Sequence, residues 1–302
     1  MRIVFLGTGG TYPSKIRNVT SIAIQMPGEV VMFDCGEGTQ RQLMSSSVSF
    51  MKVSRIFISH LHADHFLGLP GLIQSMSLNG REEPLTILGP NGTSKNVKMM
   101  LRLGYFKSRF RVLARDLSPG EVLDCGEFSV RCGKASHTIP ALAFAIQEKP
   151  RPGKFELKKA KRLGIPEGPL FRRLQQGGVV KVGGRTIRPR MVLGPPRPGR
   201  KVVYTGDTGP SKDIVALARG ADVLIHDCTL DSTHMVLARE FGHSTAAQAA
   251  RTAKLAKVGT LFLVHMSPRY EDTSILEKEA RTIFSQSHAA KDFMEYAVRF
   301  RT

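Results

Sequence analysis

Short apolar runs separated by glycine-rich turns dominate the first half of the chain. The runs RIVFLG, SIAIQM, VVMFDCG, RIFISH, LTILG and LAFAIQ all fall between residues 2 and 147 and have the length of β-strands. RIFIS is almost wholly apolar, as expected for a strand that is covered on both faces. Helices are predicted after His65 and over residues 93–104. The pattern therefore predicts a β-rich half in which helices follow some of the strands.

The same pattern returns after residue 200. KVVYTGD, DVLIHDC and TLFLVHM are predicted strands, and STAAQAARTAKLAKV, between the last two, is rich in alanine and spaced like a helix. Its Ser-Thr start is typical of a helix cap. The sequence thus predicts an α/β fold of two β-rich halves that each end in helices, with no exact internal repeat.

Residues 149–200 differ from both halves in composition. They hold 15 Lys or Arg and two acidic residues, and so contribute +13 to the net charge of +19. The segment begins and ends in proline- and glycine-containing hinges, KPRPGK and PPRPGRK. Few of its residues are expected to build a separate core. We interpret it as a basic extension inserted into a single domain spanning residues 1–302; the alternative is a disordered linker.

Composition limits the possible partners and compartment. No apolar run approaches the roughly 20 residues of a membrane span, and MRIVFLG is too short for a signal peptide, so a cytoplasmic protein without a membrane partner is expected. The four cysteines are far apart and form no C-x-x-C pair, which favours buried thiols. With 44 Lys or Arg against 25 Asp or Glu, the charge points to a polyanion such as nucleic acid or an anionic membrane surface.

Four potential metal ligands lie within six residues of ISHLHADHFLG. His60, His62, Asp64 and His65 directly follow a predicted strand, where the chain turns and neighbouring side chains can converge. Imidazole and carboxylate are donors for zinc, manganese or iron, and the cluster exceeds what core packing requires. A closed structural site is one interpretation of these four residues.

Half of an open site is the favoured interpretation, because further donors recur after other apolar runs. These are His137 in ASHTIP, Asp207 in YTGDTG and His265 in LVHMSP. Seven donors suit two metals that share a carboxylate. Two divalent cations would lower the pKa of a bound water and clamp both oxygens of a displacement at phosphorus, so the expected chemistry is hydrolysis.

The order H-x-H-x-D-H, then single His, Asp and His, resembles the metallo-β-lactamase superfamily. The resemblance covers nearly the whole chain and implies an αββα sandwich with a dinuclear site at the strand ends. It also implies one metal held by His60, His62, His137 and Asp207. It implies a second metal held by Asp64, His65, Asp207 and His265.

Within that superfamily, the loop YPSKIRNVTS resembles the P-x-K-x-R-N loop of the ribonuclease Z family. Lys15, Arg17 and Asn18 occupy its basic and amide positions, which implies RNA contacts; a solvated loop is the alternative. The stretches FDCGEGTQRQ and GLPGLIQSMSLNGR also resemble this family. The family matures tRNA 3′ ends, so precursor tRNA is the implied substrate.

FGHSTAAQAA resembles the H-S-T motif of the same family, which implies that His243 is a proton donor. An imidazole outside the metal ligands has a pKa suited to general acid catalysis. The resemblance pairs it with Asp227 in IHDCTL, where the family's H-E-A-T segment has glutamate. A helix N-cap with an incidental His243 is a second interpretation, compatible with the first.

The basic segment resembles the protruding flexible arm of the family, which grips tRNA as an exosite. Gly168 and Pro169 match its G-P motif, and Arg172 and Arg173 follow as candidate RNA contacts. Duplex phosphates would be bound by shape and counterion release. The short chain resembles the short form of the enzyme, which implies a homodimer.

The expected function is that of an endoribonuclease that removes the 3′ trailer of precursor tRNA and leaves a 3′-hydroxyl. Its implied cofactors are two zinc ions per subunit, with manganese or iron as alternatives, and a metal-activated hydroxide would attack phosphorus. Asp64 would hold the second metal and accept the nucleophile's proton. Cleavage before or after an encoded CCA is compatible with the sequence.

Three other functions fit part of the sequence. A phosphodiesterase for small or cyclic diesters fits the metal donors but gives the +13 segment no purpose. A non-catalytic RNA-binding protein fits the charge, but it would not need a complete set of metal ligands. A thioesterase or lactamase fits the donors and not the charge.

Overall fold

The computed structural model describes residues 1–300, which divide into two compact units. The larger unit consists of residues 1–125, 129–146 and 200–300. The smaller unit consists of Gly126–Phe128 and Gln147–Gly199. The basic segment expected from composition, about 149–200, falls almost wholly in the smaller unit. Each unit is described separately below.

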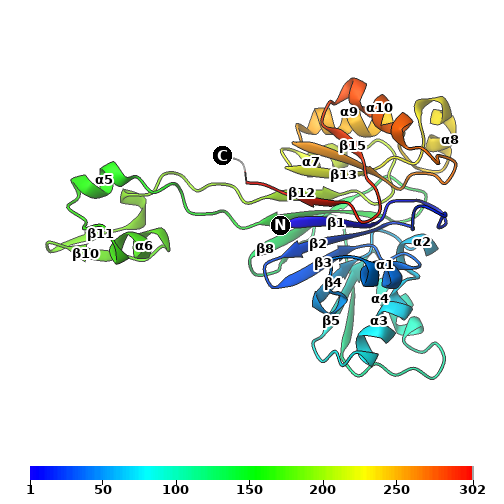
Figure 1. Ribbon diagram of the computed structural model, residues 1–302, viewed down its shortest axis with the longest axis horizontal. Coiled ribbons are helices and arrows are strands. Elements are labelled where there is room, and N and C mark those ends of the chain that lie inside the picture. The colour runs from blue at the N-terminus through cyan, green and yellow to red at the C-terminus, as the bar shows by residue number, and fades with distance from the viewer. Residues whose placement is uncertain (301–302) are drawn as a thin grey trace. The chain divides into compact units, whose positions relative to one another are not determined.

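The first sheet of the larger unit has seven strands in the order β16-β1-β2-β3-β4-β5-β6. Strands β3, β4, β5 and β6 are parallel neighbours, so their carboxyl ends lie at one edge. Helices cover the outer face of this sheet (Figure 1), where buried aliphatic side chains of both layers form one cluster. The strands are β1 Arg2–Gly7, β2 Ser21–Met26, β3 Glu29–Phe33, β4 Val53–Phe57, β5 Leu85–Gly89, β6 Val112–Asp116 and β16 Glu295–Ala297. The helices are α1 Thr39–Ser45, η1 Phe50–Lys52, α2 Ala63–Phe66, α3 Leu69–Leu78 and α4 Thr93–Met100.

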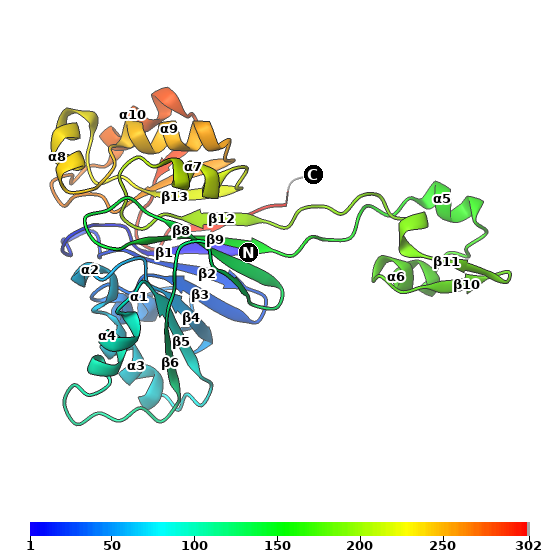
Figure 2. The ribbon, with the colours of Figure 1, turned by 180° about the vertical axis from the view of Figure 1, so that it is seen from behind.

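The second sheet also has seven strands, in the order β15-β14-β13-β12-β9-β8-β7. Strands β12, β13, β14 and β15 are parallel, and helices α7, α9 and α10 lie on the outer face of this sheet (Figure 2). The buried alanines of α9 contribute to a cluster shared with the sheet. The strands are β7 Val122–Asp124, β8 Phe128–Lys134, β9 Leu142–Glu148, β12 Lys201–Tyr204, β13 Val223–Asp227, β14 Thr260–Val264 and β15 Ser287–Ala289. The helices are α7 Lys212–Ala218, η3 Ser232–His234, α8 Met235–Glu240, α9 Ala246–Ala256 and α10 Ser274–Ile283.

Aromatic side chains join the two sheets. Phe33 of β3 stacks on Phe144 of β9 and on Tyr204 of β12, with ring centroids 5.7 and 5.6 Å apart. Phe5 of β1 meets Phe262 of β14 at 5.0 Å. Such rings bury large apolar areas, so this layer is a major source of stability. The predicted αββα sandwich is confirmed.

The strands and helices predicted from periodicity are present. Each apolar run lies in one of the strands β1–β5, β9 or β12–β14, and the predicted helices correspond to α3, α4 and α9. The capped start of α9 is also confirmed, because the Thr245 hydroxyl accepts a hydrogen bond from the Gln248 amide. One boundary differs: the short helix α2 already begins at Ala63, inside the donor cluster.

The smaller unit has a compact core of its own. Six side chains are buried: Ala160, Ile165, Leu174, Val180, Ile187 and Val192. The rings of Phe155 and Phe171 pack beside them, 4.7 Å apart. This core differs from the prediction that few of these residues build one, because the apolar residues are scattered among charged ones and show no sustained period. The elements are α5 Leu157–Arg162, α6 Pro169–Gln175, β10 Val180–Val182, β11 Arg185–Ile187 and η2 Pro189–Met191.

Two expectations from composition can be compared with the described residues. None of the helices there is both long and apolar enough to cross a membrane.

The cysteines are all free thiols, and three of them, Cys35, Cys132 and Cys228, are buried. Burial raises the pKa of Cys35 and of Cys132 to about 12, so these thiols are kept protonated and inert at neutral pH.

Candidate metal centre

Four of the seven predicted donors lie shortly after the ends of strands. His60 follows β4, Asp207 follows β12, and His265 comes directly after β14. His137 lies on the connection from β8 to β9, and the remaining donors lie in or beside α2. Parallel strands end at one edge of a sheet, so this placement brings together residues that are far apart in the sequence.

The first group consists of three histidines and an aspartate. His62 Nδ1 lies 3.0 Å from His60 Nε2 and 3.1 Å from His137 Nε2. The carboxylate oxygen Asp207 Oδ2 is 3.5 Å from His60 Nε2. The four ligand atoms lie within 4.8 Å of one another, the size of the space that one metal ion fills between its ligands.

The second group lies on the other side of Asp207, and its members are Asp64, His65 and His265. Asp64 Oδ2 is 3.6 Å from His65 Nε2 and 3.3 Å from His265 Nε2. Asp207 Oδ2 lies 3.3 Å from the first of these nitrogens and 3.2 Å from the second. One carboxylate oxygen therefore touches both groups, as a ligand shared between two metals would.

Hydrogen-bonding groups outside the two donor groups orient four of their five imidazoles. Nδ1 of His65 donates to Asp34 at 2.7 Å, Nδ1 of His137 to the Gly242 carbonyl at 2.9 Å, and Nδ1 of His265 to the Thr229 hydroxyl at 2.9 Å. His60 Nδ1 lies 3.0 Å from the Ser59 hydroxyl. With Nδ1 occupied in this way, each Nε2 keeps its lone pair for the site.

The donor set fits divalent cations. His65 Nε2 and Asp207 Oδ1 are buried and make no hydrogen bond, an arrangement that is costly unless something else binds them. Burial, reinforced by the charge of neighbouring His65, lowers the pKa of His60 well below its ordinary value, so this imidazole is neutral, as a metal ligand must be. The residues present therefore suit a pair of metal ions.

Asp34 supports the site from behind, and sequence reasoning gave it no role. Its carboxylate accepts hydrogen bonds from the Ser59 amide at 2.6 Å, the Ser59 hydroxyl at 2.7 Å and His65 Nδ1, and the Tyr204 hydroxyl also donates to it. The residue is fully buried and has a φ of 57°. Asp34 lies in the stretch FDCGEGTQRQ, which resembles the family. Only the folded chain brings its hydrogen-bond partners, after β4 and on β12, next to it.

Asp34→Asn is expected to weaken metal binding by roughly 10- to 100-fold, because an amide cannot accept all of the hydrogen bonds that orient His65. Zinc affinity measured by competition with a chelator checks this. Asp292→Asn is a matched control, since Asp292 is a half-buried carboxylate that likewise accepts several hydrogen bonds, from Thr8, Asn18 and Gln42, outside the site. Equal losses of zinc affinity in both variants would contradict the orienting role.

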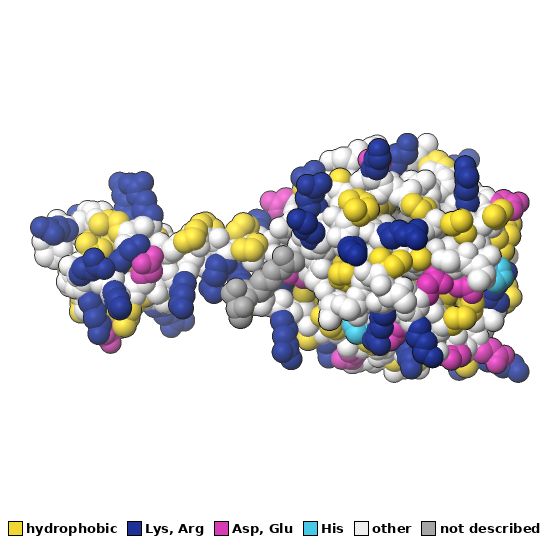
Figure 3. Space-filling model, turned by 90° about the horizontal axis from the view of Figure 1, so that it is seen from above, with side chains coloured by type: hydrophobic (Ala, Val, Ile, Leu, Met, Phe, Trp, Pro, Cys, Tyr) yellow, Lys and Arg dark blue, Asp and Glu magenta, His cyan; other side chains and the backbone are white. Residues whose placement is uncertain are grey.

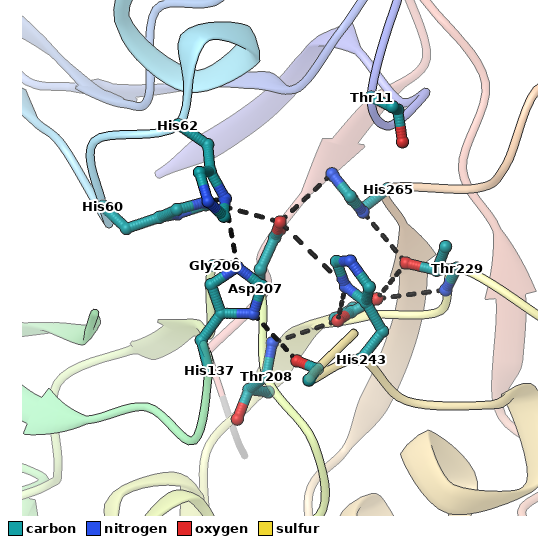
Figure 4. Close-up of polar contacts among 12 residues, drawn as sticks. Thr11, His60, His62, His137, Gly206, Asp207, Thr208, Thr229, His243 and His265 are labelled. Carbon is teal, nitrogen blue, oxygen red and sulfur yellow. Dashed lines mark hydrogen bonds and ion pairs between the residues drawn. The ribbon is translucent and has the colours of Figure 1, made fainter. Parts of the chain in front are cut away.

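A hydrogen-bonded chain links the metal donors to His243 (Figure 4). His243 Nδ1 donates to Asp227 at 2.9 Å, and Thr229 donates its hydroxyl to the same carboxylate at 2.8 Å while accepting from His265. Although burial opposes protonation, the charge and hydrogen bond of Asp227 raise the pKa of His243 to about 9. The shorter side chain of aspartate still reaches the histidine. His243 thus holds a proton at neutral pH beside the donor cluster.

Backbone strain helps to place the second group. Thr11 has a φ of 72°, unusual for a β-branched residue, and its amide donates to Asp64 Oδ2 at 2.8 Å. His265 also has a positive φ, 59°. A Cβ atom on Gly10 would lie 2.5 Å from the His265 ring, so only glycine fits at this position of the loop. Such strain is concentrated at functional sites.

The donors open into a cleft of about 540 Å³. Its walls carry His62, Asp64, His137, Asp207, His243 and His265. Six of the candidate residues thus face one solvent-accessible space. The site is open and can admit a substrate, in agreement with the preferred interpretation of the sequence.

The loop around Lys15 lines a second cleft of the larger unit. Lys15 is exposed, whereas Arg17 is buried and its guanidinium donates to the Tyr270 carbonyl. The Asn18 side chain donates to the Glu37 carbonyl at 2.8 Å. In the structure, two of the three predicted RNA contacts therefore hold the loop, and Lys15 is the one that reaches solvent.

The four candidate RNA-binding residues of the smaller unit lie at the start of α6 or within it. Gly168 precedes the helix with a φ of 128°, which suits only glycine, and Pro169 begins it. Arg172 and Arg173 are exposed. Figure 3 shows many Lys and Arg side chains on the visible face of this unit and few acidic ones.

Family models and relatives agree with this fold. Residues 187–266 match the model described as a beta-lactamase superfamily domain, and residues 1–114 match the model described as anti-Pycsar protein Apyc1. The chain is 45% identical to the ribonuclease Z of Methanosarcina acetivorans over 302 residues, 100% of this chain and 99% of that one. It is 46% identical to the ribonuclease Z of Methanothermobacter thermautotrophicus over 299 residues, which cover 99% and 97% of the two chains.

Solved structures give the same result. The human tRNase Z, short form, superposes with a TM-score of 0.74 at 30% identity and covers 99% of this chain and 100% of its own. The fold and the grouped donors define a metallo-β-lactamase-fold hydrolase. The chain belongs to the ribonuclease Z family, as the full-length identity shows. The expected enzyme class, an endoribonuclease, is thereby confirmed.

Proposed function

We propose that this protein is a zinc-dependent endonuclease that removes the 3′ trailer from precursor tRNA. The observation that carries the proposal is the convergence of seven His and Asp donors around Asp207 in a chain of this family. The relatives are called ribonuclease Z, and the human structure is of a tRNase Z. The net charge of +19 suits an RNA substrate.

The two donor groups would hold one metal ion each, with Asp207 shared. Histidine-rich ligation favours zinc, while manganese and iron accept the same donors. When bound, such a pair supplies Lewis acidity, which generates hydroxide from water near neutral pH and neutralises charge on the phosphodiester.

The chain's own residues would handle the protons. Asp64 lies in the cleft and accepts the proton that the attacking water loses. The water oxygen bonds to phosphorus as the bond between phosphorus and the tRNA O3′ breaks, the trailer keeps the phosphate, and His243 donates a proton from Nε2 to O3′. Asp227 holds the other ring nitrogen of His243 and so fixes the direction of donation. The tRNA product then ends in a 3′-hydroxyl.

RNA contacts would be divided between the two units. Lys15 would meet a phosphate near the cut, and Arg17 and Asn18 would keep its loop in place. The smaller unit would be the arm that holds the tRNA body, with Gly168 and Pro169 shaping α6 and with Arg172 and Arg173 on phosphates. We further propose a homodimer, as in the short form that the sequence resembles.

A direct comparison of substrates tests the proposed function. The zinc-loaded protein is incubated with a 3′-extended precursor tRNA, with a cyclic nucleotide and with bis-p-nitrophenyl phosphate, and kcat/KM is measured for each. The precursor is expected to be the best substrate by orders of magnitude. Faster turnover of the cyclic diester would instead identify a phosphodiesterase for small substrates.

His243→Ala is expected to separate two kinds of substrate. Cleavage of precursor tRNA should fall by about 10²- to 10⁴-fold, the usual contribution of a general acid, because the departing O3′ needs a proton. Hydrolysis of bis-p-nitrophenyl phosphate should change little, because p-nitrophenolate leaves without one. Rate measurements on both substrates check this.

His234→Ala is the matched control for this prediction. That histidine is paired with Asp231 at 2.9 Å and is not part of the cleft wall. It should leave both rates unchanged. A similar loss on both substrates in His243→Ala would contradict proton donation and point to a structural role.

A further inference from the structure

An aromatic side chain stands at the metal cleft without packing into the core. Phe241 follows α8 and lines the same cleft as the metal donors, and 53% of its surface is exposed. Leu237, one turn earlier, also lines the cleft but packs against the buried cluster behind it. The Phe241 ring is outside that cluster, so its exposed area has an unfavourable hydration free energy in the free protein.

The backbone directly after Phe241 is anchored at the site. The Gly242 carbonyl accepts from His137 Nδ1 at 2.9 Å, and the His243 amide donates to the Ala238 carbonyl at 2.7 Å. A Cβ atom on Gly242 would lie only 3.0 Å from that His137 nitrogen. Phe241 therefore precedes two residues that are anchored at the donor cluster, and its position is set together with them.

A flat apolar ring beside a hydrolytic site suits one part of an RNA chain. Metal ions and the side chains of Lys and His bind the phosphate. Of the parts of an RNA chain, only the nucleobase has an extended aromatic face. Stacking of a base on an aromatic side chain is independent of sequence, since every base has such a face. Arg269 is exposed and lines the same cleft, so a cation for the neighbouring phosphate is available there.

We propose that Phe241 is the platform on which the base of a nucleotide directly flanking the scissile phosphodiester stacks, and that Arg269 binds the adjacent phosphate. The inference rests on the proposed function and adds a base-binding subsite to it. It makes Phe241 a positioning residue: the stacked base fixes the RNA strand across the metal donors. No particular base is selected by this contact.

A double-mutant cycle between enzyme and RNA tests the subsite. One precursor tRNA is intact, and two others carry an abasic ribose at the nucleotide just 5′ or just 3′ of the cut. Phe241→Ala is expected to lower kcat/KM on the intact RNA by roughly 5- to 150-fold. On the RNA that lacks the stacked base, the same change should cost about twofold or less, because the contact is already lost.

Further variants separate stacking from folding. Phe241→Tyr keeps the flat ring and should behave like the unchanged protein, whereas Phe241→Leu keeps apolar volume without the ring and should resemble Phe241→Ala. Val236→Ala is the matched control, since Val236 is 80% exposed on the same helix and is not part of the cleft wall. Zinc per chain should be unchanged in all four variants, and Val236→Ala should also keep its hydrolysis of bis-p-nitrophenyl phosphate.

Each possible result supports or overturns the proposed base-binding subsite. Equal losses for Phe241→Ala on the intact RNA and on both abasic RNAs, or no loss on any, would overturn the subsite. A loss of bound zinc would show that Phe241 supports the metal site instead. If the unchanged protein did not cut the intact precursor, the proposed function would fail, and this is seen before any variant is compared.

Discussion

His65→Ala is expected to remove metal binding and all hydrolysis together. The His65 side chain is fully buried, its Nε2 lies 3.3 Å from the shared oxygen of Asp207, and Asp34 fixes its other nitrogen. Loss of one of the two proposed metals would remove several kcal/mol of charge stabilisation, so rates on precursor tRNA and on bis-p-nitrophenyl phosphate should both fall by about 10³-fold or more. Zinc per chain, measured by elemental analysis, should fall in parallel.

His288→Ala serves as the control for this result. His288 is a half-buried histidine of β15 that contacts the Phe262 ring at 5.5 Å, away from the donor groups. It should keep its zinc and both activities. Retention of two zinc ions and of normal rates in His65→Ala would show that the proposed ligand set is wrong.

Removal of the smaller unit is expected to abolish tRNA processing while sparing the hydrolysis of small diesters. The two chain segments that lead into the unit are neighbours, since Arg151 and Arg197 exchange backbone hydrogen bonds of 2.8 and 2.9 Å. A short Gly-Ser linker can therefore replace residues 150–199. Because residues 150–199 hold 13 Lys or Arg against two acidic residues and so carry +11, kcat/KM on precursor tRNA should fall by at least about 10²-fold, and its salt dependence should become shallow.

A charge-matched pair of variants separates binding from folding. Arg172→Glu with Arg173→Glu changes two exposed cations of α6, and Arg251→Glu with Lys254→Glu makes the same change on the exposed face of α9. The first pair should raise KM for precursor tRNA much more than the second. Equal loss of small-diester and tRNA cleavage in the deletion variant would contradict the division of labour between the units.

The parts of the fold that carry continuous apolar runs could be predicted from the sequence. Strands such as β1, β13 and β14 are buried along nearly their whole length, so their composition identifies them. β6 alternates between half-buried and exposed positions at a sheet edge and offers no such run. Helix α1 has only two buried residues in seven and was missed for the same reason.

The candidate metal donors could be predicted because their chemistry is unusual in a core. Three histidines and an aspartate within six residues are hard to explain by packing. Asp34 and Thr229 could not be found in this way, because single Asp and Thr residues are common at strand ends. Their importance comes from partners 31 and 36 positions away, His65 and His265, which only the folded chain brings to them.

The contacts of loop side chains are the hardest feature to predict from the sequence. A K-x-R-N sequence suggests three solvent-facing RNA contacts, but the fold turns the Arg17 guanidinium inward to the Tyr270 carbonyl. Burial also lowers its pKa, although not enough to remove the charge of a guanidinium. Side-chain direction in a loop depends on distant carbonyls, about which a short motif says nothing.

The most direct test of the account is to map the cut made in a 3′-extended precursor tRNA by the purified zinc-loaded protein. We expect one cut at the acceptor end, with a 3′-hydroxyl on the tRNA and a 5′-phosphate on the trailer, and no cut by His65→Ala. The position of that end also shows whether cleavage falls before or after an encoded CCA. An intact precursor, or cuts scattered along the RNA, would contradict the account.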